Sequence, residues 1–252
     1  MISIKTEKEI EIMAEGGKIL AKIMKELEKE IRPGIKTLDL DRLAESLVLK
    51  FEGKCSFKGY EGYPTCLCTS INEEIVHAVP SARILKEGDI VSLDLGIEWK
   101  GFHTDMAVTL PVGKINPQAE KLIEVTKKAL EIGIKEVKPG NYLGDIGFAI
   151  QRYVESKGFN MVRELCGHGI GKEIHEDPEI LNFGERKTGT KIREDMVLCL
   201  EPMVTMGDWR IKKSDDGFGY KTKDNSLSAH FEHTVAVVEN GHKLLTNPID
   251  ML

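Results

Sequence analysis

Apolar and small residues recur along the N-terminal part of the chain at steps of three and four positions. They fall on one face of a helix, and the series is Ile10, Met13, Gly17, Leu20, Met24, Leu27 and Ile31. Thr6 and Glu9 have the spacing of a capping box at the start of this helix, and Pro33-Gly34 follows its end. The pattern predicts a long amphipathic helix whose apolar face packs against a core.

Three further helices are predicted from patterns of the same kind. The helix after Thr37 buries Leu40, Leu43, Ala44, Leu47, Val48 and Phe51. The helix after Pro117 buries Leu122, Val125, Ala129 and Ile132. Pro139-Gly140 comes next, and the last helix buries Ile146, Ile150, Tyr153 and Val154. Two helices joined by a Pro-Gly turn are thus expected twice along the chain.

The repetition extends beyond the helices. One sequence offset relates Pro33-Gly34 to Pro139-Gly140, Asp39 to Asp145, and Asp89 to Asp195. The segments IVHAVP and EIHEDP, with His77 and His175, match at a slightly shorter offset. Chance is the alternative, because Pro-Gly after a helix is common. We favour an internal duplication and expect a single domain over residues 1–252, with halves of about 1–115 and 116–252 packed around a pseudo-twofold axis.

Composition narrows the class of protein. Of the 252 residues, 41% are hydrophobic and 30% are charged, as in soluble globular proteins. The net charge of −6 provides no basic surface for nucleic acid or an anionic membrane, and no apolar run reaches the roughly 18 residues of a spanning helix. The N-terminus lacks the apolar segment of a secretory signal, and the cysteines form no C-x-x-C pair. We therefore expect free thiols, a reducing compartment and a cytoplasmic protein.

Two aspartates lie in a predicted β-hairpin. The segment DIVSLDLGIEWKGFHTDMAVTL alternates apolar and polar residues on both sides of Lys100-Gly101. A two-residue loop there would pair Asp94 with Ala107 and Asp105 with Gly96, so that the two acids are diagonal neighbours on one face. Strands disfavour aspartate, and like charges at this spacing repel. A solvated edge hairpin is the alternative, but the apolar first strand favours an interior position and a shared cation.

Two glutamates occupy similarly apolar surroundings. Glu201 interrupts MVLCLEPMV, and Glu232 lies in SAHFEHTVAVV. An ionised carboxylate is costly to bury, so each would either keep its proton or bind a cation. We interpret all four acids as lying in buried strands around a common site. Their combined charge matches two divalent ions.

The segment CGHGIGKEIHEDP, Cys166 to Pro178, concentrates glycine around His168. Dense glycine suits either a phosphate held by backbone amides or a histidine that must reach an ion. The segment matches neither G-x-x-x-x-G-K-[ST] nor G-x-G-x-x-G, so the ion is favoured over the phosphate. An ordinary loop histidine is the remaining alternative. One imidazole and four carboxylates suit paired Mn, Fe, Co or Zn ions.

These residues in this order resemble the type I methionine aminopeptidases. The motifs are NEEIVHAVP, CGHGIGKEIHEDP, LEPMV and TKDNSLSAHFEHT, and the resemblance covers nearly the whole chain. It implies an α/β (α+β) fold of the pita-bread type, in which two pseudo-twofold-related halves form an antiparallel sheet covered by helices, with the metal site in the central cleft. It also implies hydrolysis of the initiator methionine from the N-termini of nascent polypeptides when the second residue is small and uncharged.

The resemblance also implies a role for each residue. Asp94 chelates one of two divalent ions, Asp105 and Glu232 bridge both, and His168 and Glu201 complete the second ion's ligands. Glu201 is further expected to shuttle a proton. His77 and His175 are expected to face each other across the cleft, where they hold the scissile amide and stabilise the oxyanion. Ordinary polar loop histidines are the alternative for these two.

The chain departs from the family's usual pattern at a few positions, which are Leu165, Ile174, Phe218 and His230. None of the four is expected to bind metal, so the chemistry is not affected. The expected methionine pocket consists of Tyr60, Tyr63, Cys68, Ile174 and Phe218, with His77 and His175 at the scissile bond.

Two rivals remain at this point. A proline-specific peptidase of the same fold would usually carry a separate N-terminal domain, and a non-catalytic binding protein would have lost metal ligands. We expect a monomeric enzyme without nucleic-acid or membrane partners. The physiological metal and docking on the ribosome stay open.

Overall fold

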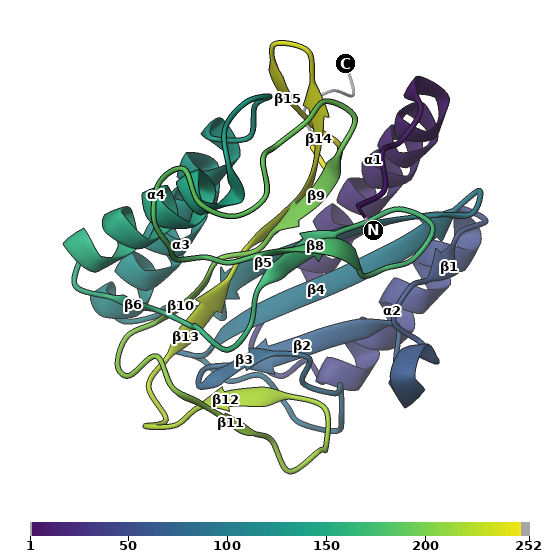
Figure 1. Ribbon diagram of the computed structural model, residues 1–252. Coiled ribbons are helices and arrows are strands. Elements are labelled where there is room, and N and C mark those ends of the chain that lie inside the picture. The colour runs from purple at the N-terminus through teal and green to yellow at the C-terminus, as the bar shows by residue number, and fades with distance from the viewer. Residues whose placement is uncertain (1, 248–252) are drawn as a thin grey trace.

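The computed structural model describes residues 2–247 (Figure 1). All four predicted helices are present: α1 Glu7–Glu30, α2 Thr37–Lys50, α3 Pro117–Lys135 and α4 Leu143–Ser156. The capping box of α1 is confirmed, because the Glu9 amide donates to the Thr6 hydroxyl and the Thr6 amide donates to the Glu9 carboxylate. At α3, the Asn116 side chain accepts from the Ala119 amide, and Pro117 takes the first helical position. None of the helices in this range is long and apolar enough to cross a membrane.

A nine-stranded antiparallel sheet forms the centre of the molecule. Its main path is β1-β4-β5-β14-β9-β7-β8, with β2 also paired to β4 and β15 to β14. The strands are β1 Lys54–Cys55, β2 Leu67–Ile71, β4 Ile90–Trp99, β5 Phe102–Pro111, β7 Gly167–Gly169, β8 Glu176–Ile180, β9 Val197–Leu200, β14 Glu232–Val238 and β15 Gly241–Leu244.

Two small sheets and a short 3-10 helix complete the fold. One sheet joins β6 Asn160–Met161, β10 Met203–Thr205 and β13 Ser228–His230. The other joins β3 Glu74–Val76, β11 Ile211–Lys213 and β12 Tyr220–Thr222. The 3-10 helix is Tyr60–Gly62. The mixed α/β architecture agrees with the expected pita-bread fold. Each half begins with a helix pair, as the duplication hypothesis requires, but the duplication stays a prediction.

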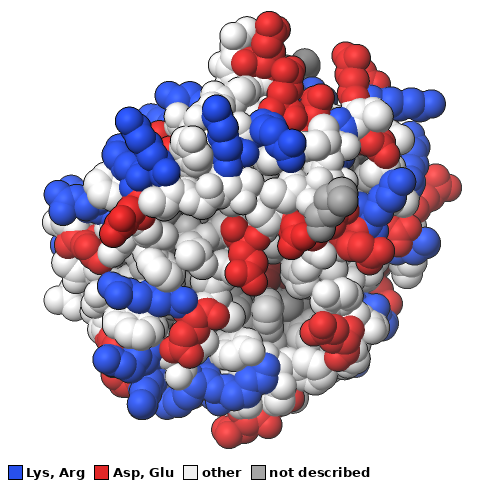
Figure 2. Space-filling view, in the orientation of Figure 1, with Lys and Arg blue, Asp and Glu red and all other residues white. Residues whose placement is uncertain are grey.

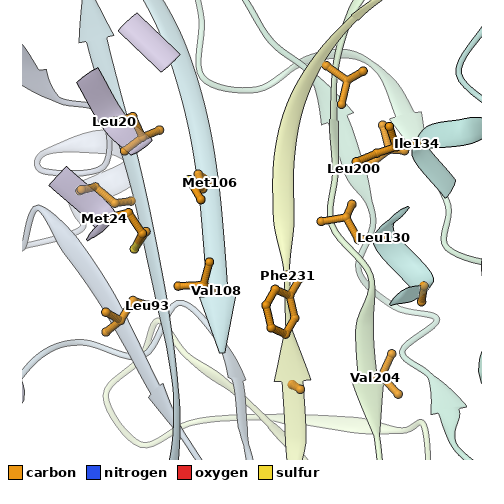
Figure 3. Packing of buried hydrophobic residues seen from close by; sticks show 14 of the residues in the cluster. Leu20, Met24, Leu93, Met106, Val108, Leu130, Ile134, Leu200, Val204 and Phe231 are labelled. Carbon is orange, nitrogen blue, oxygen red and sulfur yellow. The ribbon is translucent and has the colours of Figure 1, made fainter. Parts of the chain in front are cut away.

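The helices cover one face of the large sheet. A single apolar cluster contains residues of α1, α2, α3 and α4 together with strand residues such as Leu93 and Met106. Figure 3 shows Leu20 and Met24 of α1 on one side of this cluster and Leu130 of α3 on the other, with strands between them. Because neighbouring strand residues point to opposite faces, Asp94 and Asp105 are directed away from the helices. The face without helices therefore carries the acids.

The predicted hairpin is confirmed to the residue. Strands β4 and β5 pair with Asp94 opposite Ala107 and Gly96 opposite Asp105. Lys100 and Gly101 both have positive φ, of 51° and 84°, as a two-residue hairpin turn requires.

Strands β5 and β14 connect the first part of the chain to the last part within the large sheet. Their ladder has two residue pairs, Ala107 with Glu232 and Met106 with His233. The contact continues through the Thr234 hydroxyl, which accepts from the Asp105 amide at 2.9 Å and donates to the Asp105 carbonyl at 2.8 Å. We call this contact the β5–β14 seam.

Two expectations from the sequence are wrong. Cys55 and Cys66 form a disulfide, whereas Cys68, Cys166 and Cys199 are free. The disulfide arises because β1 and β2 pair with successive parts of β4, which brings the two Cα atoms to 5.2 Å. Glu201 lies in the break between β9 and β10 and not within a strand.

Candidate active site

A cavity of about 250 Å³ lies where β4, β5 and β14 meet the loops of the second half. It adjoins a second cavity of about 320 Å³, and both are lined by His77, Leu165, His168, His175 and Glu201. Figure 2 shows this face hollowed near its middle, with acidic side chains beside the hollow.

The structure brings the five expected metal ligands to this cavity. Asp94 comes from β4, Asp105 from β5, Glu232 from the start of β14, His168 from β7 and Glu201 from the break between β9 and β10. All five line the cavity, and the four carboxylate residues are at most 9% exposed. Ligand atoms of Asp94, Asp105 and Glu232 lie within 4.8 Å of one another, and Glu232 also groups with His168. Glu232 is therefore at the centre of the cluster.

The carboxylates cannot all be ionised without a cation. Burial raises the pKa of Asp105 to about 7. Burial, followed by repulsion from Asp105, raises the pKa of Asp94, Glu201 and Glu232 well above the ordinary range. One oxygen each of Asp94 and Glu232 is buried without a hydrogen-bond partner among the described residues. Orphaned acceptors in an acid-rich cavity suit divalent cations, so the residues present fit the metal that the sequence implies.

His168 is prepared to bind through Nε2. Its Nδ1 lies 2.8 Å from the Gly169 carbonyl oxygen, which can only accept, so Nδ1 carries the proton. Nε2 is then unprotonated and lies 3.6 Å from Glu201 Oε1. Burial lowers the pKa of His168 to about 3 and keeps the imidazole neutral.

The glycines beside His168 are explained by strand packing. A Cβ at Gly167 would collide with the Cys199 carbonyl oxygen, and one at Gly169 would collide with that of Asp177. β7 lies between β8 and β9, so these glycines let the two neighbours approach closely. The glycines therefore allow His168 to lie between two closely packed strands, which agrees with the ion-binding interpretation.

His77 and His175 both reach the cavity, one from each half. The His175 ring lies edge-on to His168 with centroids 4.5 Å apart, and its Nδ1 is 3.1 Å from the Tyr60 hydroxyl. His77 has a φ of 59°, an uncommon backbone conformation that is often found at functional sites. Burial lowers the pKa of His77 to about 4 and also lowers the pKa of His175, so both are neutral near pH 7.

Four of the five expected pocket residues line the cavity, and these are Tyr60, Tyr63, Cys68 and Phe218. Tyr63 and Phe218 meet edge to face at 5.4 Å. Ile174 is not among the lining residues, since it packs behind Tyr60 in a separate apolar cluster with Met13 and Phe102.

Sequence reasoning missed several residues of the site. Further lining residues are Phe57, Glu61, Lys213 and Tyr220. Tyr220 reaches the cavity because β12 pairs with β3, a long-range contact that no local pattern reveals. His230, which was not expected to take part in the metal site, lies fully buried against Glu201 and Glu232. The only sequence signal that pointed to His230 is that histidine departs from the family's usual residue at this position.

Known proteins resemble the chain over nearly its full length. The model of metallopeptidase family M24 matches residues 11–239. The chain is 48% identical over 246 residues to the methionine aminopeptidase of Clostridium perfringens, with 98% of this chain and 99% of the relative covered. It is 42% identical over 247 residues to that of Escherichia coli, with 97% and 94% covered.

Solved structures also resemble the chain, and a methionine aminopeptidase matches it more completely than a prolidase does. The methionine aminopeptidase of Thermotoga maritima superimposes with a TM-score of 0.96 at 46% identity, with 98% of this chain and 100% of the other covered. The prolidase of Pyrococcus furiosus gives a TM-score of 0.77 at 26% identity, and the match covers 97% of this chain but 65% of the prolidase.

Proposed function

The chain belongs to metallopeptidase family M24, among its methionine aminopeptidases, and we propose that it removes the initiator methionine from nascent polypeptides whose second residue is small and uncharged. The observation that carries the proposal is the convergence of four buried carboxylates and a neutral imidazole on one cavity. The substrate reaches this cavity in the cytoplasm, and the enzyme acts as a monomer with one catalytic domain of two related halves.

The metal site is divided among the five ligands. Asp94 would hold one divalent ion, His168 and Glu201 would hold the other, and Asp105 and Glu232 would be shared between them. This division is supported by the grouping of Glu232 with Asp94 and Asp105 on one side and with His168 on the other. Divalent ions in such a pair supply Lewis-acid chemistry, since they make water acidic enough to attack near neutral pH and polarise a carbonyl group.

Glu201 and the two histidines do the remaining chemistry. Glu201 is the general base and acid, because its carboxyl borders both cavities and lies beside the place where the scissile bond would bind. His77 and His175 bind the scissile amide from opposite halves, and as neutral imidazoles they donate hydrogen bonds to the carbonyl oxygen as it gains charge. The contact with Tyr60 holds the His175 ring in orientation.

The methionine side chain binds between Tyr60, Tyr63, Cys68 and Phe218. Aromatic edges and a thiol suit an unbranched, polarisable thioether. Tyr63 is held by its hydroxyl, which donates to the Ala78 carbonyl at 3.2 Å, so this wall is rigid. We expect at least tenfold preference for Met over Leu, about 1.4 kcal/mol, which a shape difference in an apolar pocket supplies.

Peptide hydrolysis tests the proposal. Met-Ala-Ser should be cleaved, X-Pro peptides in which X is not Met should not, and in a Met-X-Ser series the peptides with X = Lys, Leu or Phe should resist hydrolysis. Faster release from X-Pro peptides would assign the chain to the proline-specific branch of the family. Efficient cleavage of Met-Phe-Ser or Met-Lys-Ser would show an open cleft and refute the initiator-methionine assignment.

A further inference from the structure

His230 occupies a fixed position beside the metal site. It ends β13 and is 1% exposed. Its backbone is held on both sides by one hydroxyl, because the His230 amide donates to Thr109 Oγ1 and Thr109 Oγ1 donates to the His230 carbonyl, both at 2.8 Å. The backbone of His230 is therefore fixed against β5 at the edge of the metal site.

The ring of His230 has no hydrogen-bond partner within the described residues. Both of its nitrogens are fully buried and unpaired. Leaving one such group unsatisfied costs about 1–3 kcal/mol, and a buried histidine that served only packing would pair at least one nitrogen. An imidazole without hydrogen bonds at an acid-rich site is available to bind a metal ion.

The geometry around Glu201 and Glu232 is nearly symmetrical. His168 Nε2 lies 3.6 Å from Glu201 Oε1 and 4.0 Å from Glu232 Oε1. On the opposite oxygens, His230 Nε2 lies 3.6 Å from Glu201 Oε2 and 4.0 Å from Glu232 Oε2. Ligand atoms of Glu201, His230 and Glu232 all lie within 4.8 Å of one another.

We propose that His230 is a sixth metal-binding residue, which supplies a second imidazole to a divalent ion held by Glu201 and Glu232. The inference rests on the proposed metallopeptidase site and adds a selectivity to it. Imidazole suits Zn, Cu, Fe and Ni, whereas carboxylate and carbonyl oxygens suit Mn. A site with two imidazoles at this end therefore prefers the nitrogen-binding ions more strongly than a site with His168 alone.

Metal titration of the chelated, metal-free protein tests the proposal. Zn²⁺ and Mn²⁺ affinities are measured by competition with a chromophoric chelator for the wild type, His230→Gln and the control His242→Gln. His242 lies in β15, and its ring contacts the Val137 carbonyl and does not line the cavity, so its replacement should change neither affinity. His230→Gln should lose at least tenfold in Zn²⁺ affinity, about 1.4 kcal/mol, and less than threefold in Mn²⁺ affinity.

Histidine ring NMR of the wild type gives a second readout, in which His230→Gln serves only to assign the His230 signal. Adding Zn²⁺ should shift one ring-nitrogen signal that is absent from His230→Gln. An unmoved His230 signal, or equal Zn²⁺ affinities of wild type and His230→Gln, would overturn the role of His230 while leaving the proposed function intact. A wild type that binds neither metal would overturn both.

Discussion

Replacing Thr234 with valine should weaken the β5–β14 seam specifically. Thr234 is 0% exposed, and its hydroxyl both accepts from the Asp105 amide and donates to the Asp105 carbonyl. Valine fills the same volume with a methyl group in place of the hydroxyl. Thr234→Val therefore leaves one backbone donor and one backbone acceptor of Asp105 buried without partners.

The expected loss of stability follows from the Asp105 amide and the Asp105 carbonyl, which both lose their hydrogen-bond partner. A buried polar group that loses its partner costs about 1–3 kcal/mol, and a carbonyl tolerates the loss better than an amide does, so the sum is about 2–4 kcal/mol. For a chain of this size each kcal/mol lowers Tm by roughly 2–4 °C. The melting temperature should therefore fall by about 4–16 °C.

Urea unfolding of the chelated protein, followed by circular dichroism, measures the loss without a contribution from bound metal. Thr126→Val is the matched control, because Thr126 is also 0% exposed but its hydroxyl donates only to the Leu122 carbonyl one turn earlier in α3. That variant should lose less than about 1 kcal/mol, since a backbone amide still reaches the same carbonyl. A loss for Thr234→Val no larger than that of the control would refute the reasoning.

Three other outcomes are expected. Excess EDTA should abolish peptide hydrolysis and added divalent metal should restore it; full activity in the chelator would exclude a metallopeptidase. Glu201→Gln should lower kcat at least tenfold, since it removes a ligand charge and the proton acceptor, and a variant that keeps more than a tenth of wild-type kcat would contradict that role. The free energy of unfolding of the metal-free protein should fall as pH rises from about 7.5 to about 8.5. Above about pH 7.5 histidines with a pKa near 6.5 are largely neutral in both states, whereas burial raises the pKa of Asp94, Glu201 and Glu232 well above the ordinary range, so the folded state binds more protons than the unfolded state does. Urea titrations at both pH values measure the change, and a rise in stability would contradict it.

Local sequence patterns are sufficient to predict the helices, the hairpin and part of the site. The register that places Asp94 and Asp105 on one face follows from alternation and a two-residue turn, both of which are short-range properties. The capping box at Thr6 likewise depends on neighbours three positions apart. Such features are predictable because their energetics involve few residues.

Features that depend on long-range pairing were not predictable. Ile174 lies next to a site histidine in sequence, but the turn before β8 directs it into the cluster behind Tyr60. The Cys55–Cys66 disulfide depends on two strands sharing one edge of β4. The approach of His230 to Glu201 depends on β13 pairing with β10. In each case the deciding neighbour comes from a separate segment of the chain.

The β5–β14 seam also constrains the order of events during synthesis. Asp105 and its partner Thr234 are 129 positions apart, and ribosomes add about 5–20 residues per second, so roughly 6–26 s separate their appearance. For that interval one edge of β5 has no strand beside it, and bare edges invite pairing with other chains. Because α1 packs on the face of β4 and β5, that edge depends on a chaperone or on another part of the emerging chain until β14 arrives. The active site of this enzyme is therefore assembled only near the end of its own translation, when β14 has been synthesised.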